Sequence, residues 1–229
     1  MWLIATLLCF WLTRAIAQKV NHPLTNPLLL SLIILISALM ITATDYSVYL
    51  AQNHWLGDLL QPAVVALAYP LYEQLNQIKA QWRIILLTCA LGSLLSMLTS
   101  LVIGLLFHLD LSLIAALLGK SVTTPIAMAV VGDLGGEPSI AAILVVIVGL
   151  FGAVLGYPIY RLIGIRHSLS RGLTMGNVSH ALGTATCAEK KPQDAAFSSL
   201  ALVLCGIITS ILAPSLFAFT LWLAPWFGY

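Results

Sequence analysis

The chain has 229 residues, of which 60% are hydrophobic and 8% are charged, and its mean hydropathy is +1.01. Soluble domains carry about a quarter charged residues, so this composition could not cover a water-exposed surface. The formal net charge is +2 and no cluster of basic residues occurs, which argues against nucleic-acid binding. We therefore expect an all-α, polytopic membrane protein in which residues 1–229 form a single domain in the lipid bilayer.

A helix that crosses the bilayer needs about 20 mostly apolar residues. Six segments of the chain fit ordinary crossings, and they are residues 2–17, 28–43, 59–75, 84–107, 139–160 and 195–223. Asn26 followed by Pro27 is typical of a helix start, since asparagine caps and proline suits the first helical position. Ala15-Ile16-Ala17 is similar to a signal-peptidase site, but no basic residue precedes the apolar run, so we expect a retained first helix.

Two further segments, 111–132 and 172–188, are poor membrane helices because polar residues and glycines interrupt them. The first breaks at residues 119–125 and the second at residues 176–184, so each apolar half is too short to cross. We predict two broken helices that form re-entrant hairpins. The alternative, in which one or both are full crossings, remains open.

The basic residues set the expected orientation, because Lys and Arg concentrate in cytoplasmic loops. All of them except Lys120 lie on the cytoplasmic side if the first hairpin returns to the outside and the second returns to the cytoplasm. The residues concerned are Arg14, Lys19, Lys79, Arg83, Arg161, Arg166, Arg171, Lys190 and Lys191. The two hairpins would then enter from opposite faces of the membrane.

A faint internal repeat is typical of transporters built from two inverted halves. Glu73 and Cys89 are 16 residues apart, as are Glu189 and Cys205, and both pairs give an offset of 116 residues. The expected repeat halves are residues 1–110 and 111–229.

Lys120 is the first candidate site residue, because a lysine at bilayer depth is costly and is kept there for function. Its neighbours Ser121, Thr123 and Thr124 add hydroxyl groups, and Pro125 frees backbone groups at the break. A helix N-terminus at this point would attract an anion. The segment therefore suits binding of a small carboxylate. The alternative is a lysine that extends to the membrane surface from a bent helix.

The second candidate group lies in the other broken segment and includes His180, which can change protonation near neutral pH. The group consists of Asn177, Ser179, His180, Gly183 and Thr184. We expect it to bind the same carboxylate, with His180 as a possible proton carrier. The alternative is a histidine that simply packs against a neighbouring helix.

A third group, Gln61, Pro62, Pro70 and Glu73, lies in the segment that proline interrupts. Kinked helices often line a transport pathway, so we predict pathway or hinge roles for the first three and for Pro125. Glu73 is a second candidate for proton coupling. It would alternatively pair with Lys79 or Arg83 at the cytoplasmic face.

The sequence predicts neither an enzyme nor a cofactor. The motifs for nucleotide binding, serine hydrolysis and zinc hydrolysis are absent. The four cysteines Cys9, Cys89, Cys187 and Cys205 have no metal-site spacing, so we expect no metal and no disulfide framework.

Four segments resemble the LrgB/CidB family, and together they cover nearly the whole chain. They are KSVTTPIAMA at 120–129, LQPAVVALAYPLY at 60–72, SHALGTA at 179–185 and AAFSSLALVLCG at 195–206. The resemblance implies a protein of the bacterial inner (cytoplasmic) membrane that works with a smaller LrgA-type membrane protein. It further implies either transport of small monocarboxylates such as pyruvate, glycolate or 3-hydroxypropionate, or modulation of murein hydrolase activity and autolysis.

The leading hypothesis from the sequence is a proton-linked secondary transporter or facilitator of small monocarboxylates, with elevator-like motion of the hairpins. It would take a small organic-acid anion as substrate and form a homo-oligomer, expected to be a dimer. The alternative is a holin/antiholin-like modulator of autolysis. Large oligomeric pores need helices with polar stripes, and we see no such stripe in 28–43 or 84–107.

Overall fold

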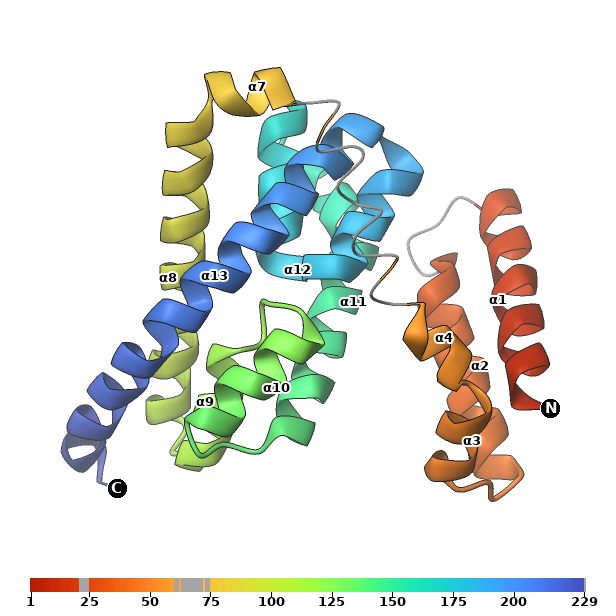
Figure 1. Ribbon diagram of the computed structural model, residues 1–229, viewed down its shortest axis with the longest axis horizontal. Helices are drawn as coiled ribbons and strands as arrows, with labels where there is room; N and C mark the ends of the chain where they lie inside the picture. Colours follow the sequence, from red (N-terminus) through yellow and green to blue (C-terminus); the bar gives the residue numbers. More distant parts are fainter. Residues whose placement is uncertain (21–24, 60–61, 63–71, 73–74, 229) are drawn as a thin grey trace. The chain divides into compact units, whose positions relative to one another are not determined.

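The computed structural model describes residues 1–20, 25–59, 62, 72 and 75–228 (Figure 1), leaving aside the side chains of residues 57, 77 and 78. The described residues form helices and no strand, which confirms the predicted all-α class. They divide into two compact units, Met1–Ala68 and Tyr69–Tyr229. Each unit is treated separately below.

The first unit is a small helical group in which two apolar helices pack together. Its helices are α1 (Trp2–Lys19), α2 (Pro27–Ile41), α3 (Tyr46–Gln52) and α4 (His54–Asp58). Asn26 Oδ1 accepts a 2.9 Å hydrogen bond from the Leu28 amide, and Pro27 is the first helical residue, which confirms the predicted helix start. The buried hydroxyls of Thr13 and Ser31, 2.7 Å apart, join α1 to α2.

The second unit has a frame of three long helices into which shorter helices fold. Its helices are α7 (Leu75–Ala80), α8 (Trp82–Leu106), α9 (Leu111–Leu118), α10 (Thr124–Asp133), α11 (Pro138–Leu162), α12 (Ser168–Lys190) and α13 (Pro192–Leu223), followed by a 3₁₀ turn at Ala224–Phe227. Helices α8, α11 and α13 form the frame. Figure 1 shows α9 and α10 together near one end of it.

Within the described residues, three helices are long and apolar enough to cross a membrane: Trp82–Leu106, Pro138–Leu162 and Pro192–Phe227. They correspond to three of the six predicted crossings. The segments 2–17 and 28–43 form α1 and α2, of which the 15-residue α2 is apolar but short. Most of segment 59–75 lies outside the described residues. Six crossings therefore stay a prediction.

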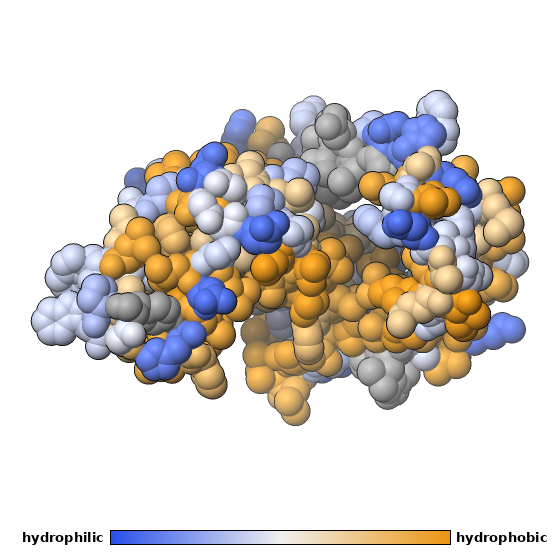
Figure 2. Space-filling view, turned by 90° about the horizontal axis from the view of Figure 1, so that it is seen from below, coloured by the Kyte–Doolittle hydropathy of each residue, from blue (hydrophilic) through white to orange (hydrophobic). Residues whose placement is uncertain are grey.

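The surfaces of the long helices are apolar, as expected for contact with lipid. Leu95 of α8, Phe151 of α11 and Ile211 of α13 are each about 60% exposed or more. Figure 2 shows hydrophobic side chains over much of the visible surface, with hydrophilic groups in smaller patches. Soluble monomers rarely expose so much contiguous apolar area, so lipid is the medium that suits these faces.

Both predicted broken helices fold back on themselves. Helices α9 and α10 are separated by the non-helical residues 119–123, and Gly119 lies close to Ala127 and Val131 of α10. Helix α12 is interrupted at His180, and a Cβ at Gly183 would approach Met175 of the preceding arm at 2.7 Å. Figure 1 shows the first hairpin opening toward the end of the frame where α8 ends and α11 begins, whereas the second opens toward the end where α13 begins.

The fold does not test every sequence prediction. The inverted repeat with an offset of 116 residues is not confirmed. A single membrane domain with repeat halves 1–110 and 111–229 likewise stays a prediction.

Candidate functional site

Lys120 lies at the tip of the first hairpin, between α9 and α10, and is half-buried against α8. Its ammonium group donates to the carbonyl oxygen of Ser96 at 3.0 Å, to Ser96 Oγ at 2.9 Å, and to Ser100 Oγ. A lysine ammonium has three hydrogens to donate. All three are therefore engaged by α8, and an incoming anion would have to displace a serine oxygen to bind.

The partner of Lys120 is a stripe of serines on α8, which we define as Ser93, Ser96 and Ser100. Residues three, four and seven apart share one face of a helix, so this spacing could have revealed the stripe in the sequence. Our prediction of no polar stripe in 84–107 was wrong for this face. The hydroxyl of Ser93 is buried and makes no hydrogen bond to nitrogen or oxygen among the described residues.

The other residues of the first hairpin tip lie close to this stripe or at the start of α10. Ser121 Oγ is 3.0 Å from Ser96 Oγ. Thr123 is the residue before α10, Thr124 is its first residue, and Pro125 occupies its first turn with an exposed ring. The N-terminus of α10 thus begins near the lysine, and both favour negative charge.

His180 lies at the tip of the second hairpin with φ 41° and ψ −128°, a backbone conformation that is unfavourable for any residue with a Cβ. Its ring Nε2 is 2.9 Å from the carbonyl oxygen of Val145 in α11, so this nitrogen carries the proton. The side chain is 3% exposed. The ring is thus a packed and bonded group, and its predicted proton-carrying role stays a prediction.

The remaining predicted residues of the second hairpin are buried against all three frame helices. Asn177 Nδ2 donates to the Cys89 carbonyl of α8 at 3.4 Å, and the hydroxyls of Thr184 and Ser198 of α13 are 2.7 Å apart. Ser179 is fully buried, and its hydroxyl has no partner among the described residues. Gly183 leaves room for Met175 across the hairpin.

The two hairpin tips meet the same parts of α8 and α11. On α8, Asn177 approaches Gly92, while Lys120 binds Ser96 one helical turn further on, which is about 6 Å along the axis. On α11, the side chain of Val145 packs in one cluster with Val122 of the first tip, and its carbonyl binds His180 of the second. The structure therefore brings the two predicted groups together.

A buried ion pair at the open end of the second hairpin was missed by our sequence analysis. Arg171 Nε is 2.9 Å from Asp194 Oδ2, and the Tyr157 hydroxyl donates to the same oxygen at 2.9 Å. The Asp194 side chain is fully buried and that of Arg171 is 14% exposed. We had placed Arg171 among the cytoplasmic loop charges, but it lies within α12 and ties that helix to α13. A basic and an acidic residue 23 positions apart give no sequence signal of pairing.

The third predicted group is largely beyond what the structure describes. Gln61, Pro70 and Glu73 lie outside the described residues, and Pro62 is exposed. Their pathway, hinge and proton-coupling roles therefore stay predictions.

Metal chemistry finds no support in the described part of the chain. No group of three or more His, Cys, Asp or Glu side chains is placed to hold a metal ion among residues that the structure describes. The four cysteines are buried and unpaired as disulfides. The two hairpin tips and the serine stripe of α8 form a polar region that is rich in hydroxyl groups and has one ammonium group. This region suits hydrogen bonding to an anion.

The sequence of this chain is similar to known proteins over most of its length. A family model described as the LrgB-like family matches residues 6–219. An uncharacterized protein of Haemophilus influenzae is 44% identical over 212 residues, which are 93% of this chain and 92% of that protein. The holin-like protein CidB of Staphylococcus epidermidis is 34% identical over 214 residues, 93% of each chain. No solved structure matches the chain.

Proposed function

Because this chain belongs to the LrgB-like family, we propose that it is a holin-like protein of the bacterial inner membrane that modulates murein hydrolase activity and autolysis. The observation that carries this proposal is the 34% identity to a holin-like protein across 93% of both chains. The comparisons thus favour the autolysis role, our alternative from the sequence, over monocarboxylate transport. The proposed protein crosses the membrane several times and acts without catalysing a reaction.

The test of the holin-like role is the rate of detergent-induced lysis in cells that carry or lack the chain. We expect deletion to change the lysis rate, and plasmid-borne wild-type protein to restore it. An unchanged lysis rate after deletion would overturn the proposal.

Carriage of small monocarboxylates is a second candidate, favoured by the geometry around Lys120. The ammonium group, the serine stripe and the start of α10 converge at one place, as small-anion sites require. A carboxylate that displaced Ser100 from Lys120 would gain a charge-assisted hydrogen bond, which is stronger than a neutral one. Binding would then remove one of the contacts between the first hairpin and α8, while those to Ser96 remain.

The test of carriage is uptake of labelled pyruvate, glycolate or 3-hydroxypropionate into proteoliposomes. We expect Lys120→Met to lower the uptake at least tenfold, while the matched variant Lys79→Met in α7 leaves it unchanged. Stimulation by an inward proton gradient, and its loss in His180→Gln, would support proton coupling. Equal uptake by the Lys120 and Lys79 variants would remove Lys120 from the site.

Release of a large dye from the same vesicles separates the two candidates. A holin-like lesion passes molecules much larger than pyruvate, whereas a carrier retains them. Co-purification with an LrgA-type membrane protein, and the mass of the purified assembly, test the proposed partner and the proposed homodimer.

A further inference from the structure

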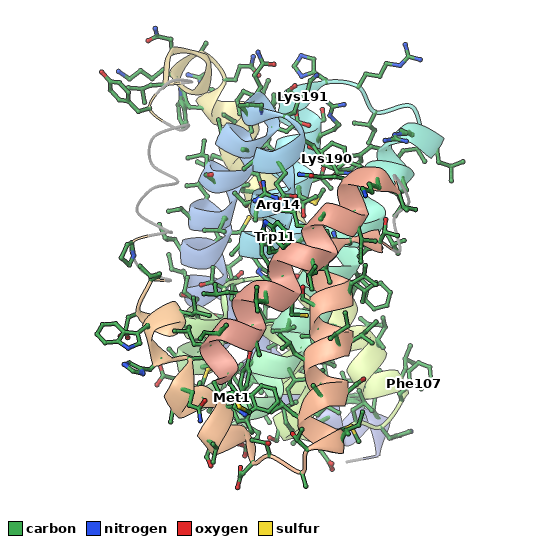
Figure 3. All side chains as sticks on the ribbon, turned by 90° about the vertical axis from the view of Figure 1, so that its right-hand side faces the viewer. Met1, Trp11, Arg14, Phe107, Lys190 and Lys191 are labelled. Atoms are coloured by element: carbon green, nitrogen blue, oxygen red, sulfur yellow. The ribbon has the colours of Figure 1, made fainter. Side chains whose placement is uncertain are left out.

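A basic surface lies at the end of the second unit where α12 ends and α13 begins. We define it as Arg161, Arg166, Lys190 and Lys191, all of which are exposed. Figure 3 labels Lys190 and Lys191 at this end and Phe107, just past α8, toward the opposite end. Arg161 lies in the last turn of α11 and Arg166 follows in the loop to α12, so three separate segments contribute positive charge.

The charges of this surface repel one another and lack matching acidic groups. Burial lowers the pKa of Lys190, and the positive charge of Arg161 lowers it further, whereas Glu189 raises it. Asp194 is buried and already paired with Arg171. The exposed acidic neighbour is thus Glu189 alone among the described residues of this surface, which leaves a net positive charge for an external anion.

Two features hold the basic surface in place and set its depth. Lys190 Nζ lies 4.8 Å from the centre of the Tyr157 ring, a cation–π contact that fixes its direction. Leu162 and Ile163, immediately after Arg161, are 85% and 60% exposed. Leu162 is the last residue of the apolar helix Pro138–Leu162, one of the candidate membrane spans, and Ile163 caps it. Apolar side chains next to basic ones at a span end suit the boundary between acyl chains and headgroups.

We propose that this basic surface binds the phosphate of an anionic phospholipid headgroup, with Leu162 and Ile163 lying among its acyl chains. Arg161 and Lys190 are the central pair, because their mutual repulsion is relieved when a phosphate lies between them. Arg166 and Lys191 form the outer pair. The inference is independent of either proposed function, since it concerns a surface away from the hairpin tips.

The experiment is native mass spectrometry of the full chain in a neutral detergent, titrated with phosphatidylglycerol or phosphatidylcholine. We expect phosphatidylglycerol to bind at least tenfold more tightly. The double variant R161Q/K190Q should lose that preference by about tenfold or more, because each basic residue near a membrane surface contributes measurably to anionic lipid binding. Equal binding of the two lipids by the wild-type chain would overturn the proposal.

The matched control is K79Q/R83Q, which removes the same formal charge from α7 and α8. It should retain the preference, and an equal loss in this variant would show general charge attraction instead of a site. A second variant, R166Q/K191Q, alters residues without the Tyr157 contact and should weaken binding while leaving the melting temperature unchanged. Addition of inorganic phosphate should not displace the lipid, and displacement would mean that the surface selects a free anion.

Discussion

The two hairpins of the second unit differ in where their charged contacts lie. At the tip of the first, Lys120 donates to serine oxygens and a carbonyl of α8, and Ser121 Oγ lies 3.0 Å from Ser96 Oγ. The apolar side chains of this hairpin, among them Ile114 and Val122, pack in two buried clusters. The second is packed along its length, where Gly172 and Gly176 allow α13 to approach and Gly152 of α11 makes room for Ser179. Both hairpins are packed, but the charged contacts of the first lie at its tip, whereas the ion pair of the second lies at its open end.

This difference indicates which hairpin is suited to move. Hydrogen bonds can be exchanged for bonds to water or a solute at little net cost, whereas a close-packed interface has few alternative arrangements. A ligand that competes for Lys120 would weaken the polar contacts at the tip of the first hairpin and leave those of the second unchanged. We therefore expect the first hairpin to move when a ligand binds near the two tips, and the second hairpin to stay in place.

The largest expected effect is at the ion pair that closes the second hairpin. Asp194→Ala leaves Arg171 without its carboxylate, and breaking one partner of a buried pair costs about 3–5 kcal/mol of unfolding free energy. Denaturant unfolding in mixed micelles measures it. The double variant R171M/D194L should be less destabilised than Asp194→Ala, because no buried charge is left alone. Unchanged stability of Asp194→Ala would show that the pair does not hold this hairpin.

A methyl group at Gly176 tests the close packing of the second hairpin. Its Cβ would lie 2.2 Å from the Ser198 carbonyl oxygen and 2.8 Å from Ala201 Cβ, so Gly176→Ala should cost about 2–3 kcal/mol through overpacking. The matched change on the first hairpin is Gly132→Ala, where the nearest atom, in Pro138, is 3.6 Å away. That variant should be neutral or slightly stabilising. Equal melting temperatures for the two variants would contradict the comparison.

The sequence revealed the hairpins because local features cause them. A lysine with hydroxyl neighbours and a proline makes a poor membrane helix wherever it occurs, so Lys120 and the break near His180 could be predicted. The serine stripe of α8 was also readable from its spacing. Pairing of Arg171 with Asp194 depends on how α12 and α13 pack, and no local pattern reports such a contact.

Loss of one serine should weaken the first hairpin by a smaller amount. Ser100→Ala removes one acceptor from the Lys120 ammonium, and a hydrogen bond to a charged group contributes about 1.5 kcal/mol or more. Thr99→Ala is the neighbouring control, since the exposed Thr99 hydroxyl donates to carbonyls of its own helix. Protease cleavage at residues 119–123 reports release of the tip, and we expect it to be faster in the Ser100 variant than in the Thr99 variant. Faster cleavage in the Thr99 variant than in the Ser100 variant would argue against the anchor.

The smallest expected effect separates backbone strain from side-chain bonding at His180. Both His180→Gly and His180→Ala lose the ring bond to the Val145 carbonyl, but only alanine keeps a Cβ in the positive-φ conformation. Glycine should therefore be the more stable variant by about 1 kcal/mol, the reverse of their order inside a regular helix. Melting temperatures in detergent measure the difference. If alanine were the more stable, α12 would run straight through residue 180, and the second hairpin would not turn there.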